Sequence, residues 1–415
     1  MIEFSREKLG NGLTVIVHED FSTPLVAVNI LYDVGSRDED PSSTGLAHLF
    51  EHLMFGGSVN IPDFDTQLQI AGGENNAFTN NDITNYYLTI PADNIETALW
   101  LESDRMASLD FSETILEVQK KVVIEEFKQR YLNQPYGDAM LKLRPLAYNT
   151  HPYRWPTIGM DEAHIESVTL DKVREFFYSH YCPNNAILTI AGNIHVNEAQ
   201  RLVRKWFDDL PPGNKAVRKL PVEPAQNSPR TLTLEKNVPA DVIYKVWHTG
   251  KRTDSDFYTL DLLTDLLAGG ESGRLYEALV REKKLFSDIN AYITGDIDPG
   301  LLMVTGRLMK GVGMEEAEES INDELSKYHA SSMISRRDME KVRNKFEATN
   351  IISSTGILYK AMSLSYFELI GDAGLINKEV ENYMGITPEM VASTASEYLR
   401  DSNCSTLYYK SVKSK

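Results

Sequence analysis

The stretch Leu46-Ala47-His48-Leu49-Phe50-Glu51-His52-Leu53 contains the pattern that decides the fold. On a helix, positions i, i+3 and i+4 share one face, so His48, Glu51 and His52 project together. Alone, such a pattern also fits a polar patch on a surface helix. Here apolar residues surround it, which indicates a buried helix whose imidazoles and carboxylate need compensation. The pattern therefore predicts a zinc site, with His48 and His52 as ligands and Glu51 as the base that deprotonates a metal-bound water.

A catalytic zinc needs a third protein ligand besides the two histidines. A helical segment at 119–128 carries adjacent glutamates, Glu125 and Glu126. Neighbouring side chains on a helix point about 100° apart, so only one of the two is expected to face inward. Val122 and Val123 precede Glu126 by four and three positions, which favours Glu126 over Glu125. The alternative is that both glutamates are solvated.

In the rest of the chain, sequence patterns typical of strands and of helices follow each other in no regular order. Short runs rich in β-branched residues predict strands, and longer periodic runs predict helices. The strands are expected at 13–17, 26–31, 85–90 and 186–191, and the helices at 92–107 and 112–131. Such a mixture lacks the regular alternation of a parallel barrel and predicts an α+β fold.

A proline-rich, polar segment at 211–230 divides the chain almost in half and is expected to be a linker. With 415 residues the chain is too long for one ordinary core, so two domains are predicted. These are a zinc-binding catalytic domain at 1–210 and a second domain at 231–415 that lacks the zinc pattern.

The two halves resemble each other faintly. Residues 46–57 and 259–270 are both apolar helices that end in Gly-Gly, and 112–127 resembles 335–350 in charge and apolar rhythm. In this overlay the positions of His48, Glu51, His52 and Glu126 hold Asp261, Thr264, Asp265 and Thr349. The similarity reflects either chance or two copies of one fold, with metal chemistry in the first copy only.

Composition excludes several classes of protein. The formal net charge of −18 disfavours nucleic acid as a partner, because phosphate binding needs a basic surface. No uninterrupted apolar run approaches the length of about 18 residues that indicates a membrane span. Cys182 and Cys404 are far apart, so neither a disulfide framework nor a thiolate zinc site is predicted. The N-terminal residues lack a secretory pattern, so we expect a cytoplasmic protein, or a periplasmic one if an export signal has been removed.

In these residues the sequence resembles the M16 family of metallopeptidases, also called pitrilysins or inverzincins. His-x-x-Glu-His near the start is followed, at the family's usual separation, by Glu126 in a Val-Val-x-x-Glu context. Further segments look like family landmarks in the family's order. They are Asn11-Gly12-Leu13, Gly45-Leu46-Ala47-His48, Gly72-Gly73-Glu74-Asn75-Asn76-Ala77-Phe78-Thr79, His151-Pro152-Tyr153, Tyr181-Cys182-Pro183-Asn184-Asn185 and Ala191-Gly192-Asn193.

The resemblance implies a fold of two homologous domains, each a mostly antiparallel sheet with helices packed on it. It also implies one Zn²⁺ per chain, held by His48, His52 and Glu126, with Glu51 as general base. The residues that match the family's edge strand, on which an extended peptide pairs through its main chain, are Asn76, Ala77, Phe78 and Thr79.

Two positions depart from the family pattern. Gln119 stands seven residues before Glu126, where the family commonly has a second glutamate; its neutral amide is expected to orient the ligand with less charge. Arg281 matches a substrate-binding arginine of the second domain, although a plain salt bridge is an equal alternative. The tyrosine that usually follows this arginine is absent, because Ser287 or Asp288 occupies its place.

Chains of this length resemble half of the family's four-domain clamshell, which two-domain members complete by dimerising. The expected function is a zinc endopeptidase of extended peptides or short unfolded polypeptides, working as a homodimer or as a heterodimer with another M16-like subunit. The missing tyrosine favours a heterodimer. The alternative is a non-catalytic M16-like scaffold, as in the core subunits of respiratory complex III.

Overall fold

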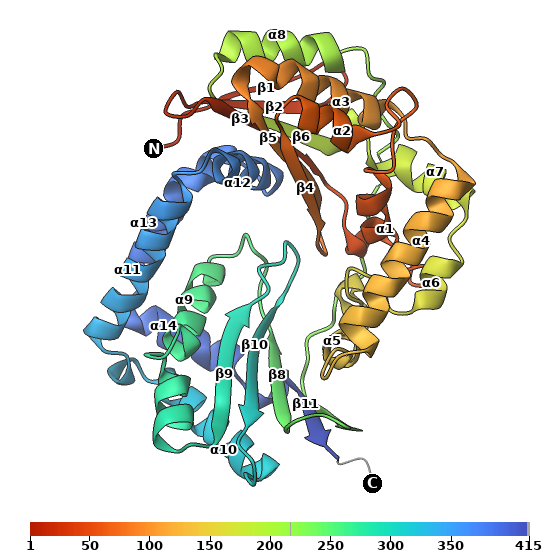
Figure 1. Ribbon diagram of the computed structural model, residues 1–415. Coiled ribbons are helices and arrows are strands. Elements are labelled where there is room, and N and C mark those ends of the chain that lie inside the picture. The colour runs from red at the N-terminus through yellow and green to blue at the C-terminus, as the bar shows by residue number, and fades with distance from the viewer. Residues whose placement is uncertain (216, 413–415) are drawn as a thin grey trace. The chain divides into compact units, whose positions relative to one another are not determined.

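The chain folds into two compact units, each built around one β-sheet (Figure 1). The computed structural model describes residues 1–215 and 217–412. The first unit comprises Met1–Phe127, Trp155–Leu220 and Ile351–Lys378, and the second comprises Lys128–Arg154, Pro221–Asn350 and Glu379–Lys415. Strands and helices are mixed in each unit, so the predicted α+β class is confirmed.

The sheet of the first unit has six strands in the order β1-β2-β6-β3-β5-β4. Only β2 and β6 run parallel; the other neighbours are antiparallel. The strands are β1 (Ser5–Lys8), β2 (Thr14–Glu19), β3 (Leu25–Tyr32), β4 (Glu74–Thr79), β5 (Thr84–Pro91) and β6 (Ala186–Gly192). The central strands β3 and β6 are apolar and almost wholly buried, whereas β4 is polar and lies at one edge. The predicted strands in this part of the chain are all present.

The first unit also contains helices with buried apolar sides. They are α1 (Leu46–Leu53), α2 (Phe64–Ile70), α3 (Ile95–Ala107), α4 (Glu113–Phe127), α6 (Glu162–Glu166), α7 (Leu170–His180), α8 (Val196–Phe207) and α12 (Ile357–Leu369). In α8, for example, Ala199, Leu202, Val203 and Phe207 are buried at helical spacing. Helices α3 and α8 lie on one face of the sheet and α12 on the other (Figure 1). Within 1–215 and 217–412, no helix has both the length and the apolar character to cross a bilayer.

The second unit repeats the topology of the first. Its strands are β7 (Arg230–Lys236), β8 (Val242–His248), β9 (Phe286–Ile293), β10 (Leu301–Leu308) and β11 (Cys404–Ser411). Their order, β7-β11-β8-β10-β9, matches β2-β6-β3-β5-β4, and β7 and β11 form the one parallel pair. Its helices are α5 (Ala139–Ala147), α9 (Asp256–Ala268), α10 (Met314–Ser326), α11 (Arg336–Ser353, which ends in the first unit), α13 (Glu379–Met384) and α14 (Pro388–Tyr398). The faint internal similarity therefore reflects two copies of one fold.

The two copies exchange one helical segment each. Residues 128–154, which include α5, belong to the second unit, and residues 351–378, which include α12, belong to the first. Helix α5 packs on β11, β8 and β7, and α12 packs on β6 and β3. Because β11 and β8 correspond to β6 and β3, the exchanged helices occupy equivalent places on the two sheets.

The predicted contiguous domains therefore differ from the compact units. The chain does pass between units at Leu220, inside the predicted linker 211–230. However, 1–210 and 231–415 each contribute a segment to the other unit's core. Hydrophobic periodicity shows that such a segment is helical, but it does not show which of two similar apolar sheets the helix covers.

Helix α12 is seated on the first sheet by small and polar side chains. Ala361 is completely buried against Ala27 and Ala191, which allows the helix to approach the strands closely. One turn further on, the Ser365 hydroxyl accepts a hydrogen bond from the Asn29 amide (2.8 Å) and donates one to Thr189 (2.8 Å). These buried polar groups are satisfied only when α12 occupies this place.

Replacement of Ala361 by leucine tests this seating. The larger side chain enters a contact between alanines, so we expect the free energy of unfolding to fall by about 1–3 kcal/mol. Urea unfolding followed by circular dichroism measures the change. Ala348→Leu, the same substitution at an exposed position of α11, is the matched control. Equal stability of the two variants would contradict a close α12–sheet contact.

Candidate metal centre

Helix α1 is the buried helix predicted from the His-x-x-Glu-His pattern. Leu46, Leu49, Phe50 and Leu53 are all buried. The helix begins after Gly45, which has φ +91° and whose absent Cβ would lie 2.5 Å from the carbonyl oxygen of Ile158. Glycine is therefore required both for the left-handed conformation and for the close approach of the two backbones.

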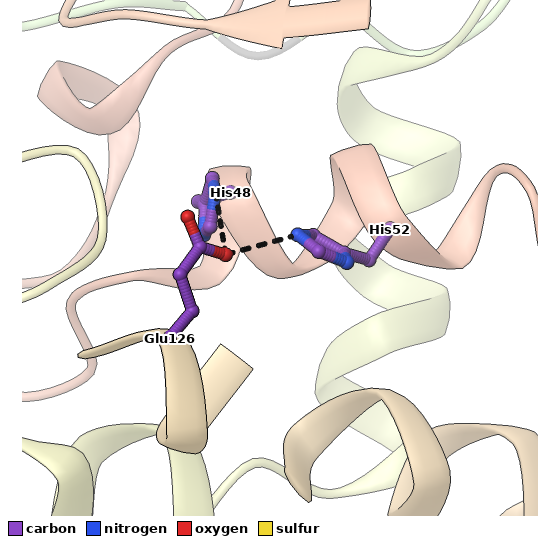
Figure 2. A group of neighbouring side chains, drawn as sticks. All are labelled: His48, His52 and Glu126. Carbon is purple, nitrogen blue, oxygen red and sulfur yellow. Dashed lines mark ion pairs between the residues drawn. The ribbon is translucent and has the colours of Figure 1, made fainter. Parts of the chain in front are cut away.

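Three of the predicted side chains converge in space. His48 and His52 extend from α1 toward Glu126 on α4 (Figure 2). Oε2 of Glu126 lies 3.7 Å from Nε2 of His48 and 3.5 Å from Nε2 of His52. Ligand atoms about 2.0–2.1 Å from a tetrahedral zinc are separated from each other by about 3.4 Å. The two imidazoles and the carboxylate thus fit a single zinc ion, and no other group of this kind occurs among the described residues.

Glu126, and not Glu125, is the glutamate that reaches the histidines. The side chain of Glu126 is only 20% exposed, whereas Glu125 is exposed. One of the two reasons for preferring Glu126 was wrong, because Val122 is exposed and only Val123 is buried. The buried side of the helix around Glu126 is formed by Val123 and the following Phe127.

Glu51 lies on the same helix between the two histidines and is half-buried. Burial raises the pKa of its carboxyl group above the ordinary glutamate value. The hydroxyl and N–H of Thr79 and the nearby His52 act in the opposite direction, whereas Glu126 adds to the rise in pKa. A raised pKa suits a general base, which works best when its pKa approaches the operating pH.

Strand β4 brings the four predicted peptide-binding residues, Asn76–Thr79, next to this helix. It pairs only with β5, so its other edge is unpaired within the sheet. Helix α1 contacts β4, and Thr79 at the end of the strand lies against Glu51. The N–H of Ala77 donates a hydrogen bond to Oδ1 of its neighbour Asn76 (2.8 Å). The expected edge strand is therefore present beside the helix that carries His48 and His52.

Gln119 and Arg281, the other two predicted site residues, have no described contact with His48, His52 or Glu126. Gln119 lies half-buried on α4, and no described hydrogen bond joins it to Glu126. Arg281 is exposed in a π-helical turn of the second unit, Tyr276–Glu282. Among the described residues it has no ion-pair partner, so the plain salt bridge is not observed. The roles of both residues stay predictions.

Among the described residues of the second unit there is no equivalent metal site. In α9, which corresponds to α1, Asp261 and Asp265 stand where His48 and His52 stand in the first copy. Asp261 accepts a hydrogen bond from the Tyr383 hydroxyl (2.5 Å), and Asp265 pairs with Lys345 (2.7 Å). The protein's own side chains thus satisfy both carboxylates, which agrees with metal chemistry in the first copy only.

Sequence reasoning missed a residue that contacts the start of helix α1, which carries the two histidines. Glu39 is buried, and its carboxyl group accepts hydrogen bonds from the backbone N–H groups of Gly45 and Ala47 at the start of α1. No spacing rule connects Glu39 to this helix, because the intervening residues form an irregular loop. Only the folded loop reveals the contact.

Comparison with known proteins agrees with this geometry. Residues 14–154 match the family described as Insulinase (Peptidase family M16), and residues 167–346 match the Peptidase M16 inactive domain. Zinc protease PqqE of Helicobacter pylori is 28% identical over 412 residues, which cover 97% of this chain and 91% of that protein.

Solved structures give the same result. The crystal structure of a protease from Helicobacter pylori has a TM-score of 0.92 and 26% identity, covering 99% of this chain and 100% of that one. The periplasmic protease PqqL from Escherichia coli matches with a TM-score of 0.80 and 17% identity, but only 48% of its chain is covered. Sequence, fold and paired family domains all agree: the chain belongs to the M16 family of peptidases.

Proposed function

We propose that this protein is a zinc-dependent endopeptidase that cleaves extended peptides or short unfolded polypeptides. The observation that carries the proposal is the convergence of His48, His52 and Glu126 around one ligand-sized space, with Glu51 on the same helix face. The naming of the PqqE relative as a zinc protease supports this assignment. A non-catalytic scaffold needs none of these four side chains.

The chain's own residues divide the work of peptide hydrolysis. Zinc, when bound by His48, His52 and Glu126, polarises the scissile carbonyl and lowers the pKa of water toward about 7. Glu51 accepts a proton from the attacking water and returns it to the leaving amine. The unpaired edge of β4 aligns the peptide by main-chain hydrogen bonds, so the scissile bond lies beside Glu51. Selection then depends on an extended backbone more than on one side chain.

We also propose that the working enzyme is a dimer. The chain spans about half the length of the PqqL protease that its fold matches, so two copies or two related chains provide an equal amount of structure. Ser287 and Asp288 lie in the second unit where a substrate-binding tyrosine was expected, and the Ser287 hydroxyl bonds to Asp288 (3.1 Å). A different M16-like subunit that supplies the tyrosine explains this substitution, which favours a heterodimer.

The ligand set predicts different effects of substitution at two adjacent glutamates. Glu126→Gln removes the carboxylate ligand, so we expect zinc affinity to fall by more than the about 10–100-fold caused by losing an outer hydrogen-bond partner. Glu125→Gln, at the neighbouring exposed position, is expected to retain about one zinc per chain. Metal analysis after dialysis measures both. Equal zinc content in the two variants would exclude Glu126 as a ligand.

The decisive experiment separates zinc binding from cleavage. Glu51→Gln preserves the shape of the side chain but cannot accept the proton, so we expect normal zinc content and cleavage slowed by about 10²–10⁴-fold. A quenched peptide library measures cleavage, alone and after addition of a second M16-like chain. A zinc-free wild type without cleavage under either condition would support the scaffold alternative instead.

Peptide pairing on β4 is tested at Ala77. Ala77→Pro removes a backbone N–H and places a ring at the open edge, where proline is otherwise tolerated. We expect cleavage to fall at least about 10-fold while zinc content and the thermal midpoint stay near wild type. Unchanged cleavage by the folded, zinc-loaded variant would mean that peptides do not pair with β4.

A further inference from the structure

The metal-binding helix α1 is short and has no local cap. It contains 8 residues, and an isolated helix of this length is unstable in water. Its first N–H groups have no partner within the helix and need acceptors from elsewhere. The N-cap residue is Gly45, which has no side chain that accepts a hydrogen bond. The helix therefore depends on contacts from other segments to hold its first turn.

Glu39 supplies these acceptors from six positions before Gly45. Its Oε2 accepts the N–H of Gly45 (2.9 Å), and its Oε1 accepts the N–H of Ala47 (2.8 Å). The residue is 6% exposed, and burial raises the pKa of its carboxyl group, although the two N–H groups and the Trp155 side chain oppose the rise. Among the described residues, no cationic side chain pairs with it. Both carboxyl oxygens thus bind the start of α1, and the Trp155 side chain also lies against the carboxyl group.

The segment that carries Glu39 is held in place by contacts of the residues before it. The two residues before it are held by ion pairs within the first unit, Arg37 with Asp82 (2.8 Å) and Asp38 with Arg218 (2.7 Å). The carbonyl of the preceding Ser36 accepts a hydrogen bond from the Trp155 indole (2.9 Å). These contacts join the segment that carries Glu39 to other parts of the first unit, independently of α1.

We propose that Glu39 is a positioning residue for the metal centre: it holds the first turn of α1 and thereby sets the place of His48. Ala47, whose N–H it binds, directly precedes His48 in the chain. Loss of this hydrogen bond frees the turn that carries His48, whereas His52 lies one turn further along. The inference rests on the proposed zinc site, because it assigns Glu39 an effect on zinc geometry.

Glu39→Gln tests the role with little change in side-chain volume. The amide oxygen still accepts one N–H, but the amide NH₂ faces the other N–H and cannot accept it. We expect zinc affinity at least about 10-fold weaker, the range found for lost support of a metal ligand. The spectrum of the cobalt-substituted protein is expected to change, and kcat at saturating zinc to fall with KM unchanged.

Glu223→Gln is the matched control. Glu223 also accepts backbone N–H groups, those of Asn149, Thr150 and His151, but it does so in the second unit. We expect its substitution to lower the thermal midpoint without changing zinc affinity or the cobalt spectrum. An equal loss of zinc affinity in both variants would show a general loss of stability and overturn the proposal.

A second variant keeps the proposal testable if the Glu39→Gln protein does not fold. Glu39→Asp keeps the carboxylate but shortens its reach, so we expect a smaller loss of zinc affinity in a stable protein. Wild-type affinity and spectrum in every folded Glu39 variant would overturn the role of Glu39. Failure of the wild type to bind zinc would instead overturn the proposed function, so the two failures are distinguishable.

Discussion

The metal centre depends on the packing of α1 against α4, which places two imidazoles and a carboxylate within ligand distance of each other. Burying such groups is unfavourable unless they are paired or bind a metal. The carboxylate of Glu126 lies between the two histidines, but one carboxylate does not use all the donor and acceptor capacity of two rings. A zinc ion held by these three side chains would satisfy them together, which is why the geometry supports the proposed metal site.

The same fold occurs twice in the chain with different consequences. Both copies have the same strand order and the same parallel pair, and each covers one sheet face with a helix from the other half of the sequence. The copies diverge where α1 and α9 correspond. In the second copy, the carboxylates of Asp261 and Asp265 bind Tyr383 and Lys345. The architecture is therefore kept, but these carboxylates need no metal ion to compensate them. Because the helices are exchanged, each hydrophobic core contains residues from both halves of the sequence. The folding of the two units is therefore coupled.

Much of the site could be predicted because it follows local periodicity. The common face of His48, Glu51 and His52 requires only that the segment be helical. Glu126 lies beside the two histidines as predicted, but only part of the reason for choosing it holds, since Val122 is exposed. The helix exchange and the contact of Glu39 with α1 could not be predicted, because both depend on which non-local surfaces meet. Neither periodicity nor residue spacing contains that information.

The open edge of β4 places a further constraint on the proposed binding of a peptide. An unpaired edge invites association with other chains, and here it is short and polar, with the Ala77 N–H already bonded to Asn76. A peptide that pairs at this position replaces an existing hydrogen bond, so each bond contributes only about 0.5–1.5 kcal/mol. Several residues of extended chain are then needed for useful affinity. Thr79 lies against Glu51 at the end of the same strand, so a peptide paired along β4 as proposed would also be aligned with Glu51.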